Sequence, residues 1–152
     1  MGAANIARKN WQAIRNSGNG TVVAVASRDL ARAKQFLNEC QQDAPMEGPG
    51  SAYGSYDALL RDPNIDAVYI PLPTGIRKGW VMRAAEAGKH VLCEKPCARS
   101  VAELTEMIRD TDRMWLNISA GREFDARLYR TEDEDETSSE TPPLVRIWRK
   151  EA

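Results

Sequence analysis

Short runs of apolar residues along this chain alternate with longer stretches in which apolar residues recur at helical spacing. Three uncharged runs are typical of strands buried in a parallel sheet, and they lie at 21–26, 67–70 and 91–93. Helical spacing predicts helices at 7–16, 30–40, 55–60, 79–87 and from Ser100 onward. This alternation predicts an α/β fold in which right-handed crossovers join parallel strands.

Capping and turn residues mark where these elements begin and end. Asp29 is placed to cap the helix that follows the first strand, and Ser100 with Glu103 forms a capping box. Residues 41–50 are rich in Pro, Gly and Asp and are expected to form a loop. Pro96 ends the third strand, because a proline cannot donate to an interior ladder.

The order of elements predicts a Rossmann-type parallel sheet with flanking helices over residues 1–109. Such a sheet begins with a strand that leads into a glycine turn, and Met1 occupies that place, so we expect an N-terminally truncated domain lacking its first strand. Residues 110–152 show no sustained period, and 132–136 are all acidic. We expect a divergent, irregular and largely disordered tail there, in which 144–149 alternates well enough for a strand.

Charge narrows the possible partners. The formal net charge is −1, but outside the acidic tail the basic residues outnumber the acidic ones. A mildly basic domain suits a small molecule that carries phosphate. The basic residues form no stripe of the kind expected in a nucleic-acid binder. No apolar run is long enough for a membrane span and no signal peptide is visible, so we expect a cytoplasmic protein that does not bind membranes.

Metal binding is not expected from the cysteines and the histidine. Cys40, Cys93 and Cys97 show no Cys-x-x-Cys spacing, and His90 is the only histidine. Reduced, structural thiols are the expectation.

Candidate chemistry lies at the carboxyl ends of the predicted strands, where open α/β sheets bind ligands. Glu94 and Lys95 follow the strand at 91–93, so Lys95 is placed to contact a substrate or a cofactor. The alternative is an ordinary surface ion pair after a core strand, because most Lys and Glu side chains are solvated.

Two further stretches suit a dinucleotide. Residues 2–7 are a relaxed G-x-G-x-x-G/A motif at a helix start, where free N–H groups can bind a pyrophosphate. Ser27 and Arg28 follow the first predicted strand, and a hydroxyl with a guanidinium suits a 2′-phosphate, which favours NADP over NAD. The alternative for this stretch is a surface turn capped by Asp29.

Together these stretches resemble the nucleotide-binding domain of the Gfo/Idh/MocA family of oxidoreductases over residues 2–108. The motifs are GAANIARK at 2–9, ASRD at 26–29, IDAVYIPLPT at 65–74 and AGKHVLCEKP at 87–96. The pattern looks most similar to the branch of dihydrodiol dehydrogenases and NADP-dependent xylose dehydrogenases.

The resemblance implies an NAD(P)-binding domain, with hydride transfer between NADP, or NAD as the alternative, and a sugar or diol CH–OH group. It implies Lys95 as the catalytic residue. The cofactor-binding residues that it implies are Gly2, Ala3, Ala4, Asn5, Ile6, Ser27, Arg28, Arg32, Leu72, Pro73, Thr74, Arg77, Glu94 and Lys95.

The chain also departs from the family. Arg77 stands where members often carry a His, and the second domain, which forms most of the substrate pocket, is not recognisable after Ile108. A small polyol or sugar is therefore expected as a substrate only if a second domain completes the site, and a homo-oligomer is possible. The alternatives are a non-catalytic nucleotide-binding or interaction fragment, or a truncated gene product.

Overall fold

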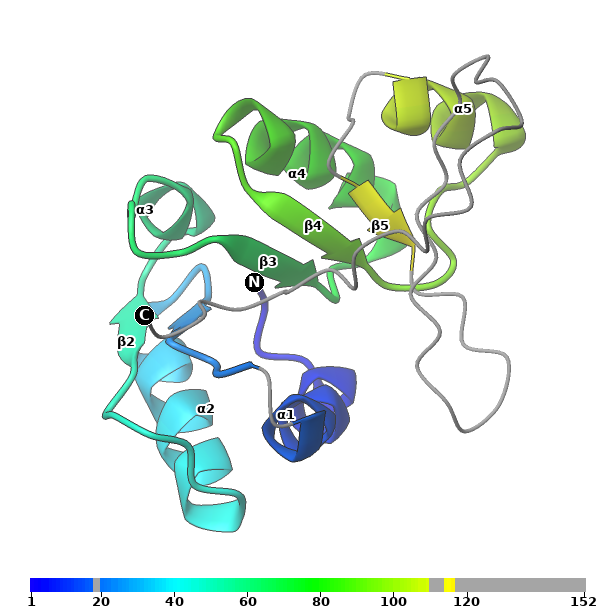
Figure 1. Cartoon of the computed structure of the whole chain (residues 1–152). Helices are drawn as coiled ribbons and strands as arrows, with labels where there is room; N and C mark the ends of the chain where they lie inside the picture. Colours follow the sequence, from blue (N-terminus) through cyan, green and yellow to red (C-terminus); the bar gives the residue numbers. More distant parts are fainter. Residues whose placement is uncertain (18–19, 110–113, 117–152) are drawn as a thin grey trace, which may run out of the picture.

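Helices and parallel strands alternate along the computed structural model, which describes residues 1–17, 20–109 and 114–116 (Figure 1). The helices are α1 (Asn5–Ser17), α2 (Leu30–Asp43), α3 (Tyr56–Leu60), α4 (Thr74–Glu86) and α5 (Val101–Arg109). The strands are β1 (Ala24–Ala26), β2 (Ser51–Tyr53), β3 (Ala67–Ile70), β4 (His90–Cys93) and β5 (Met114–Leu116). Each strand pair is parallel, which confirms the α/β prediction.

Two strands were not predicted from the sequence. β2 is short and none of its residues is buried, so it has no apolar run to reveal it. β5 lies beyond Arg109, in the part expected to be an irregular tail, and pairs with β4 from Val91 to Cys93. Both strands are specified by a neighbouring strand that they pair with, rather than by a local pattern. The predictions for 132–136 and 144–149 lie outside the described residues.

Several predicted boundaries were wrong, and α2 runs to Asp43, into the segment expected to form a loop. The run at 21–26 forms a strand only from Ala24, and α4 begins at Thr74 rather than at Gly79. The first turn of α4 escaped prediction because Arg77, a charged residue, is buried where the pattern calls for an apolar one, while Ile76 is exposed.

The first two residues join two sets of strands. β1 pairs with β2, β4 lies between β3 and β5, and no ladder among the described residues joins β1 to β3. The Met1 amino group donates to the Tyr69 carbonyl oxygen (2.6 Å), and the Gly2 N–H donates to the Ala26 carbonyl oxygen (2.8 Å). Met1 and Gly2 therefore lie between β1 and β3, as the N label in Figure 1 shows beside β3.

Helices cover both faces of the strands, with α1 and α2 on one side and α4 and α5 on the other (Figure 1). Successive residues of β1 point to opposite faces, since Val25 packs in one core and Ala26 in the other. The core around α1 and α2 contains Trp11, Val25, Ala33, Phe36, Leu37, Cys40 and Ala44. The larger core lies beneath α3, α4 and α5 and includes Leu59, Val68, Ile70, Val81, Val91 and Met107.

Side chains cap the starts of α2 and α5. Asp29 caps α2 as predicted, because its carboxylate accepts a hydrogen bond from the Ala31 N–H (2.8 Å). Ser100 Oγ accepts from the Glu103 N–H (3.2 Å), but the Glu103 carboxylate returns to the Arg99 N–H (2.8 Å) rather than to Ser100. The predicted capping box is thus formed in part. None of the described helices is long and apolar enough to span a membrane.

The cap at Asp29 yields a stability prediction. We expect Asp29→Ala to lower the free energy of unfolding by about 1 kcal/mol, because the Ala31 N–H loses its acceptor. Asp29→Asn, which keeps an oxygen at the cap, should cost less than half as much. Urea denaturation of the three proteins measures this, and equal stabilities of the Ala and Asn variants would contradict it.

Candidate functional site

A crevice of about 760 Å³ opens where the loops after β1 and β3 meet the start of α1. Its size falls in the usual range for ligand pockets, roughly 300–1,000 Å³. The crevice is lined by Gly2, Ala3, Ala4, Ser27, Arg28, Asp29, Arg32, Tyr56, Pro71, Leu72, Pro73, Thr74 and Arg77. Most of the cofactor-binding residues predicted from the sequence thus lie together at the carboxyl edge of the strands.

Gly2 keeps one wall of the crevice thin. Its φ is +95°, a conformation that L side chains rarely adopt, and a Cβ placed on it would lie 2.9 Å from Leu72 Cδ2. The backbone of the turn can therefore approach both Leu72 and a ligand closely. This is the physical reason for a glycine at the start of the motif.

The start of α1 presents a positive end to the crevice. Ala3 and Ala4 line the crevice, and the first turn of α1 carries no acidic residue to compete for its free N–H groups. Such a helix end favours an anion. Asn5 and Ile6, which were also predicted to bind the cofactor, are exposed and do not line the crevice.

Two arginines flank this helix end. Ser27 is buried after β1, whereas Arg28 is exposed at the crevice. Arg32 on α2 reaches across, and its guanidinium donates to the Ala3 carbonyl oxygen (3.3 Å). Since the Asp29 carboxylate is engaged at the cap of α2, the charged groups left to face a ligand here are guanidinium groups.

Arg77 is buried and connects two loops. Its Nε donates to the Leu72 carbonyl oxygen (2.9 Å), and one terminal nitrogen donates to the carbonyl oxygens of Glu94 (2.7 Å) and Pro96. Arg77 was predicted to contact the cofactor. Although it lines the crevice, its guanidinium bonds to the main chain and holds the loop after β3 against the loop after β4.

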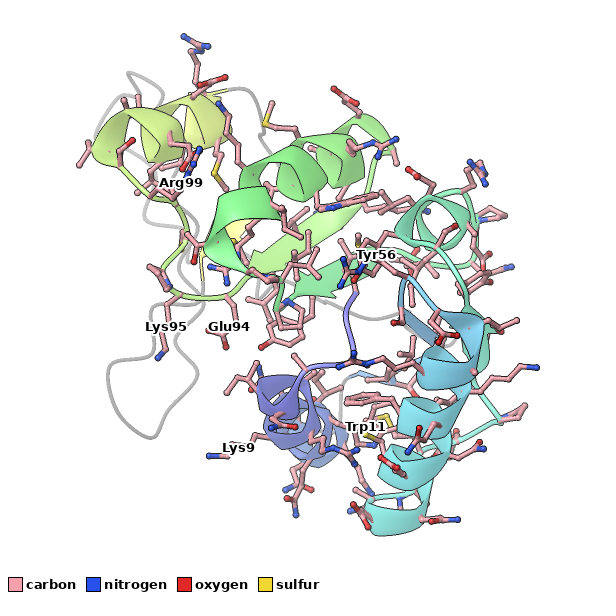
Figure 2. The ribbon with its side chains drawn as sticks, turned by 180° about the vertical axis from the view of Figure 1, so that it is seen from behind. Lys9, Trp11, Tyr56, Glu94, Lys95 and Arg99 are labelled. Atoms are coloured by element: carbon pink, nitrogen blue, oxygen red, sulfur yellow. The ribbon has the colours of Figure 1, made fainter. Side chains whose placement is uncertain are left out.

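Glu94 and Lys95 have different environments on the loop after β4. The Glu94 carboxylate is buried, and it accepts hydrogen bonds from the Tyr69 hydroxyl (2.9 Å) and from the Lys95 N–H (2.8 Å). The Lys95 side chain is exposed, and Figure 2 shows its ammonium group pointing away from the ribbon. Neither residue lines the crevice. The two hydrogen bonds that the Glu94 carboxylate accepts orient the loop that carries Lys95.

Tyr69 was not recognised from the sequence as part of the site. Burial, and then the hydrogen bond to Glu94, raise the pKa of Tyr69, so its hydroxyl stays protonated and remains a donor. The sequence offered one hint, the hydroxyl group of Tyr69 in the otherwise apolar strand Ala67–Ile70. Three residues that do line the crevice, Tyr56, Pro71 and Asp29, were likewise not predicted to bind the cofactor.

Cys93 and Cys97 lie on either side of the Lys95 loop. A hydrogen bond from the Cys93 thiol lowers the pKa of Cys97, and the positive charge of Arg77 acts in the same direction. The pKa of Cys93 is raised, by the same hydrogen bond and by burial. Both are free thiols, and among the described residues no cluster of His, Cys, Asp or Glu could hold a metal ion.

Known proteins resemble this chain in sequence and in fold. A family model described as "Oxidoreductase family, NAD-binding Rossmann fold" (Gfo/Idh/MocA) matches residues 1–120. The match extends beyond Ile108, the last residue of the resemblance seen in the sequence motifs, and includes β5.

Individual relatives match over similar stretches. D-xylose 1-dehydrogenase (NADP(+)) 2 of Haloferax volcanii is 45% identical over 103 residues, covering 68% of this chain and 30% of the relative. Human trans-1,2-dihydrobenzene-1,2-diol dehydrogenase is 45% identical over 89 residues, covering 59% of this chain and 25% of the relative. Both enzymes belong to the branch that the sequence motifs indicated.

The fold matches a solved structure as well. KijD10, a 3-ketoreductase from Actinomadura kijaniata crystallised with NADP and TDP-benzene, superposes with a TM-score of 0.66 at 33% identity. The superposition covers 76% of this chain and 35% of KijD10. This chain thus spans about a quarter to a third of the length of the proteins that it matches.

The buried guanidinium of Arg77 yields the second prediction. Arg77→Met should lower the free energy of unfolding by roughly 2–4 kcal/mol, because the buried carbonyl oxygens of Leu72 and Glu94, and the partly buried one of Pro96, lose a charged donor. Arg83→Met on the same helix is the matched control: its guanidinium is half-exposed beside Asp57, and its loss should cost less than about 1 kcal/mol. Urea denaturation that finds equal losses for the two variants would show that Arg77 does not hold the loops together.

The thiol pair yields the third prediction. At pH 7 iodoacetamide should alkylate Cys97 before Cys40 and Cys93, because its lowered pKa gives more thiolate and its side chain is partly exposed. Peptide mass spectrometry measures the three rates. Cys93→Ala should slow the alkylation of Cys97 by removing the donor, whereas Cys40→Ala should leave it unchanged. Equal rates at all three thiols would refute the assignment.

Proposed function

The chain belongs to the Gfo/Idh/MocA oxidoreductase family, and on this premise we propose that it binds NADP in the crevice between α1 and the loops after β1 and β3. The observation that carries the proposal is that three features that favour an anion meet in one crevice. These features are an acid-free helix start, Arg28 after β1, and Arg32 reaching over from α2.

Each part of the crevice suits one part of the cofactor. The pyrophosphate fits against Gly2, Ala3 and the free N–H groups of α1, where a positive helix end and a missing side chain leave room for it. Ser27, Arg28 and Arg32 hold the 2′-phosphate, since a guanidinium binds phosphate with paired hydrogen bonds. The loop at 72–74 forms the opposite wall.

NADP is preferred over NAD on electrostatic grounds. A carboxylate that accepts the ribose 2′-hydroxyl is typical of NAD sites, and the one acid that lines this crevice among the described residues, Asp29, already accepts the Ala31 N–H. The two exposed guanidinium groups beside it gain little from the 2′-hydroxyl of NAD, whereas they attract the 2′-phosphate dianion of NADP. The xylose dehydrogenase relative is named for NADP, and KijD10 was crystallised with it.

The proposed reaction is hydride transfer between NADP and the CH–OH group of a sugar or diol. Bound NADP supplies the hydride acceptor or, when reduced, the donor. Lys95 is the proposed catalytic residue: its ammonium donates a hydrogen bond or a proton to the substrate oxygen, on a loop held by Glu94 and Arg77. Under this proposal, the parts of the longer relatives that this chain does not match form the rest of their site.

A nucleotide-binding module without turnover is the second candidate. It is favoured by the exposure of Lys95, because a catalytic ammonium gains most from a desolvated position opposite its substrate. Reduction of NADP in the presence of sugars and diols separates the two candidates. Turnover that is lost in Lys95→Met, with NADP affinity retained, supports the enzyme.

The fourth prediction concerns the 2′-phosphate. Arg28→Ala should weaken NADPH binding at least tenfold and leave NADH binding unchanged, because only NADPH carries the phosphate that Arg28 pairs with. Isothermal titration calorimetry measures both affinities. Arg61→Ala, an exposed arginine outside the crevice, is the control and should change neither. Equal effects of Arg28→Ala on both cofactors would remove the 2′-phosphate assignment, and no binding of either would remove the proposed function.

A further inference from the structure

Cys93 and Cys97 lie at the two ends of the loop that carries Lys95. Cys93 is the last residue of β4 and is fully buried, whereas Cys97 follows Pro96 and is partly exposed. Both side chains pack in the larger core. The third cysteine of the chain, Cys40, is buried on α2 in the other core. The two thiols that flank Lys95 therefore share one environment, apart from the third.

The sulfur atoms of Cys93 and Cys97 are already in contact. The Cys93 thiol donates a hydrogen bond to the Cys97 sulfur, and Cys93 Sγ lies 4.0 Å from the Cys97 carbonyl oxygen. These bonds hold the thiol weakly, because a thiol is a weak hydrogen-bond donor. A disulfide requires the two sulfur atoms to approach to about 2.05 Å. Contact between the reduced thiols is the arrangement from which such a bond forms.

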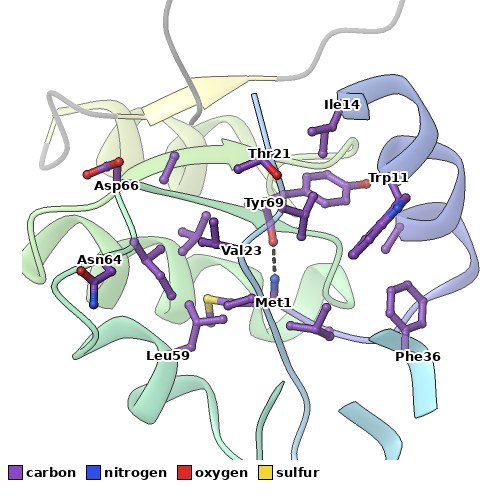
Figure 3. Close-up of a pocket in the computed structure, with 18 residues that line it drawn as sticks. Met1, Trp11, Ile14, Thr21, Val23, Phe36, Leu59, Asn64, Asp66 and Tyr69 are labelled. Atoms are coloured by element: carbon purple, nitrogen blue, oxygen red, sulfur yellow. Dashed lines mark hydrogen bonds between the residues drawn. The ribbon is translucent and has the colours of Figure 1, made fainter. Parts of the chain in front are cut away.

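The main chain between the two cysteines is held by other residues. The guanidinium of Arg77 donates to the carbonyl oxygens of Glu94 (2.7 Å) and Pro96. The Glu94 carboxylate accepts from the hydroxyl of Tyr69, whose ring Figure 3 shows directed from β3 toward α1. Groups that a fold keeps together react with a much smaller loss of entropy than groups that meet by diffusion. The two sulfur atoms are therefore placed to react with each other.

The two thiols differ in acidity. A hydrogen bond from Cys93 lowers the pKa of Cys97 to about 7, and the positive charge of Arg77 acts in the same direction. Burial and the charge of Glu94 oppose this shift without cancelling it. About half of the Cys97 side chains are thus thiolate at pH 7, and the thiolate is the nucleophilic form. The pKa of Cys93 is raised by the same hydrogen bond and by burial, so Cys93 stays protonated beside it.

Access to Cys97 favours a small oxidant. Its side chain is only partly exposed. Hydrogen peroxide is small and uncharged, so it reaches a partly buried sulfur without displacing the loop. A larger disulfide has to bring its own sulfur into contact with Cys97 and leaves a bulky mixed disulfide there. Peroxide is therefore favoured over exchange with an external disulfide.

We propose that Cys97 is a site of oxidation by hydrogen peroxide and that Cys93 resolves the product, so that a disulfide closes across the Lys95 loop. In the first step the Cys97 thiolate attacks a peroxide oxygen; an S–O bond forms, the O–O bond breaks and hydroxide leaves, which gives a sulfenic acid. In the second step the Cys93 sulfur attacks the Cys97 sulfur; an S–S bond forms, the S–O bond breaks, and the hydroxyl group leaves with the Cys93 proton as water. The two sulfur atoms together lose two electrons, and these reduce the peroxide to hydroxide and water.

The first step favours the second. The hydrogen bond to Cys97 and the negative charge of its thiolate both raise the pKa of Cys93 in the reduced protein. A neutral sulfenic acid carries no such charge, so the Cys93 thiol loses its proton more readily once Cys97 is oxidised. The disulfide then closes a ring of residues 93–97 and fixes the loop that carries Lys95. None of these steps involves the crevice or a bound cofactor, so the thiol chemistry does not depend on the proposed function.

The test uses the whole reduced chain, treated with hydrogen peroxide at pH 7, after which the remaining thiols are blocked with N-ethylmaleimide. Trypsin releases residues 90–99 as one peptide, because it does not cut before Pro96, and a glutamate-specific protease then cuts this peptide after Glu94. Mass spectrometry should find the fragments 90–94 and 95–99 joined, without label, and separated by reduction. Separate fragments that are labelled at both cysteines, or that hold a sulfinic acid at Cys97, would overturn the proposal.

Single substitutions assign the role of each thiol. Cys97→Ala should slow the oxidation of Cys93 at least tenfold, and an unchanged rate would overturn the assignment of Cys97 as the attacking thiol. Cys93→Ala should leave at least tenfold more sulfenic acid at Cys97, trapped by dimedone, than the unmodified chain does. Equal trapping in the two proteins would show that Cys93 does not resolve it. Cys40→Ala is the matched control and should change the rate of linkage less than twofold.

Two further measurements separate this chemistry from unspecific oxidation. Cys97 should react at least tenfold faster than Cys40, whose pKa is raised by burial, and equal rates would overturn the proposal. Non-reducing electrophoresis should show a monomer, because the linkage lies within one chain, and a disulfide-linked dimer as the main product would equally overturn it. If circular dichroism shows that Cys93→Ala is unfolded, the linked fragments of the unmodified chain still decide the question.

Discussion

Two main-chain hydrogen bonds made by Met1 and Gly2 organise much of this molecule. They tie β3 to β1 through consecutive residues, so the relative position of the two sets of strands depends on one short segment. The same segment leads directly into α1 and sets that helix start against the loops after β1 and β3. Gly2 can do this because its positive φ and missing side chain allow close approach to Leu72. The shape of the crevice is thus a consequence of this constraint.

A buried cation provides the second link. The guanidinium of Arg77 carries its charge into the interior, where it is balanced by carbonyl oxygens of the loops after β3 and β4. Burial of a charge is unfavourable unless it is fully hydrogen-bonded, so the geometry of these loops is tightly coupled to the position of this side chain. Glu94 is coupled to the same arrangement through Tyr69. The orientation of Lys95 therefore depends on residues that need not contact a substrate.

The crevice and the Lys95 loop divide the tasks expected of a dinucleotide oxidoreductase. Positive groups gather at the helix start and after β1, where phosphate is favoured, while the loop after β4 carries an exposed ammonium. Family membership explains why these parts occur on one chain.

Much of the fold followed from local physics. Continuous apolar runs located β1, β3 and β4, and Asp29 and Ser55 capped helices as their side chains favour. Most residues that line the crevice come from the motifs at 2–9, 26–29 and 65–74, because strand ends and helix starts are encoded by neighbouring residues. Tertiary structure alone decided the rest. β2 and β5 are strands because of the partners beside them, and Arg77 connects two loops because carbonyl oxygens of both converge on it. Such arrangements depend on contacts between segments remote in the chain, which no local pattern of residues records.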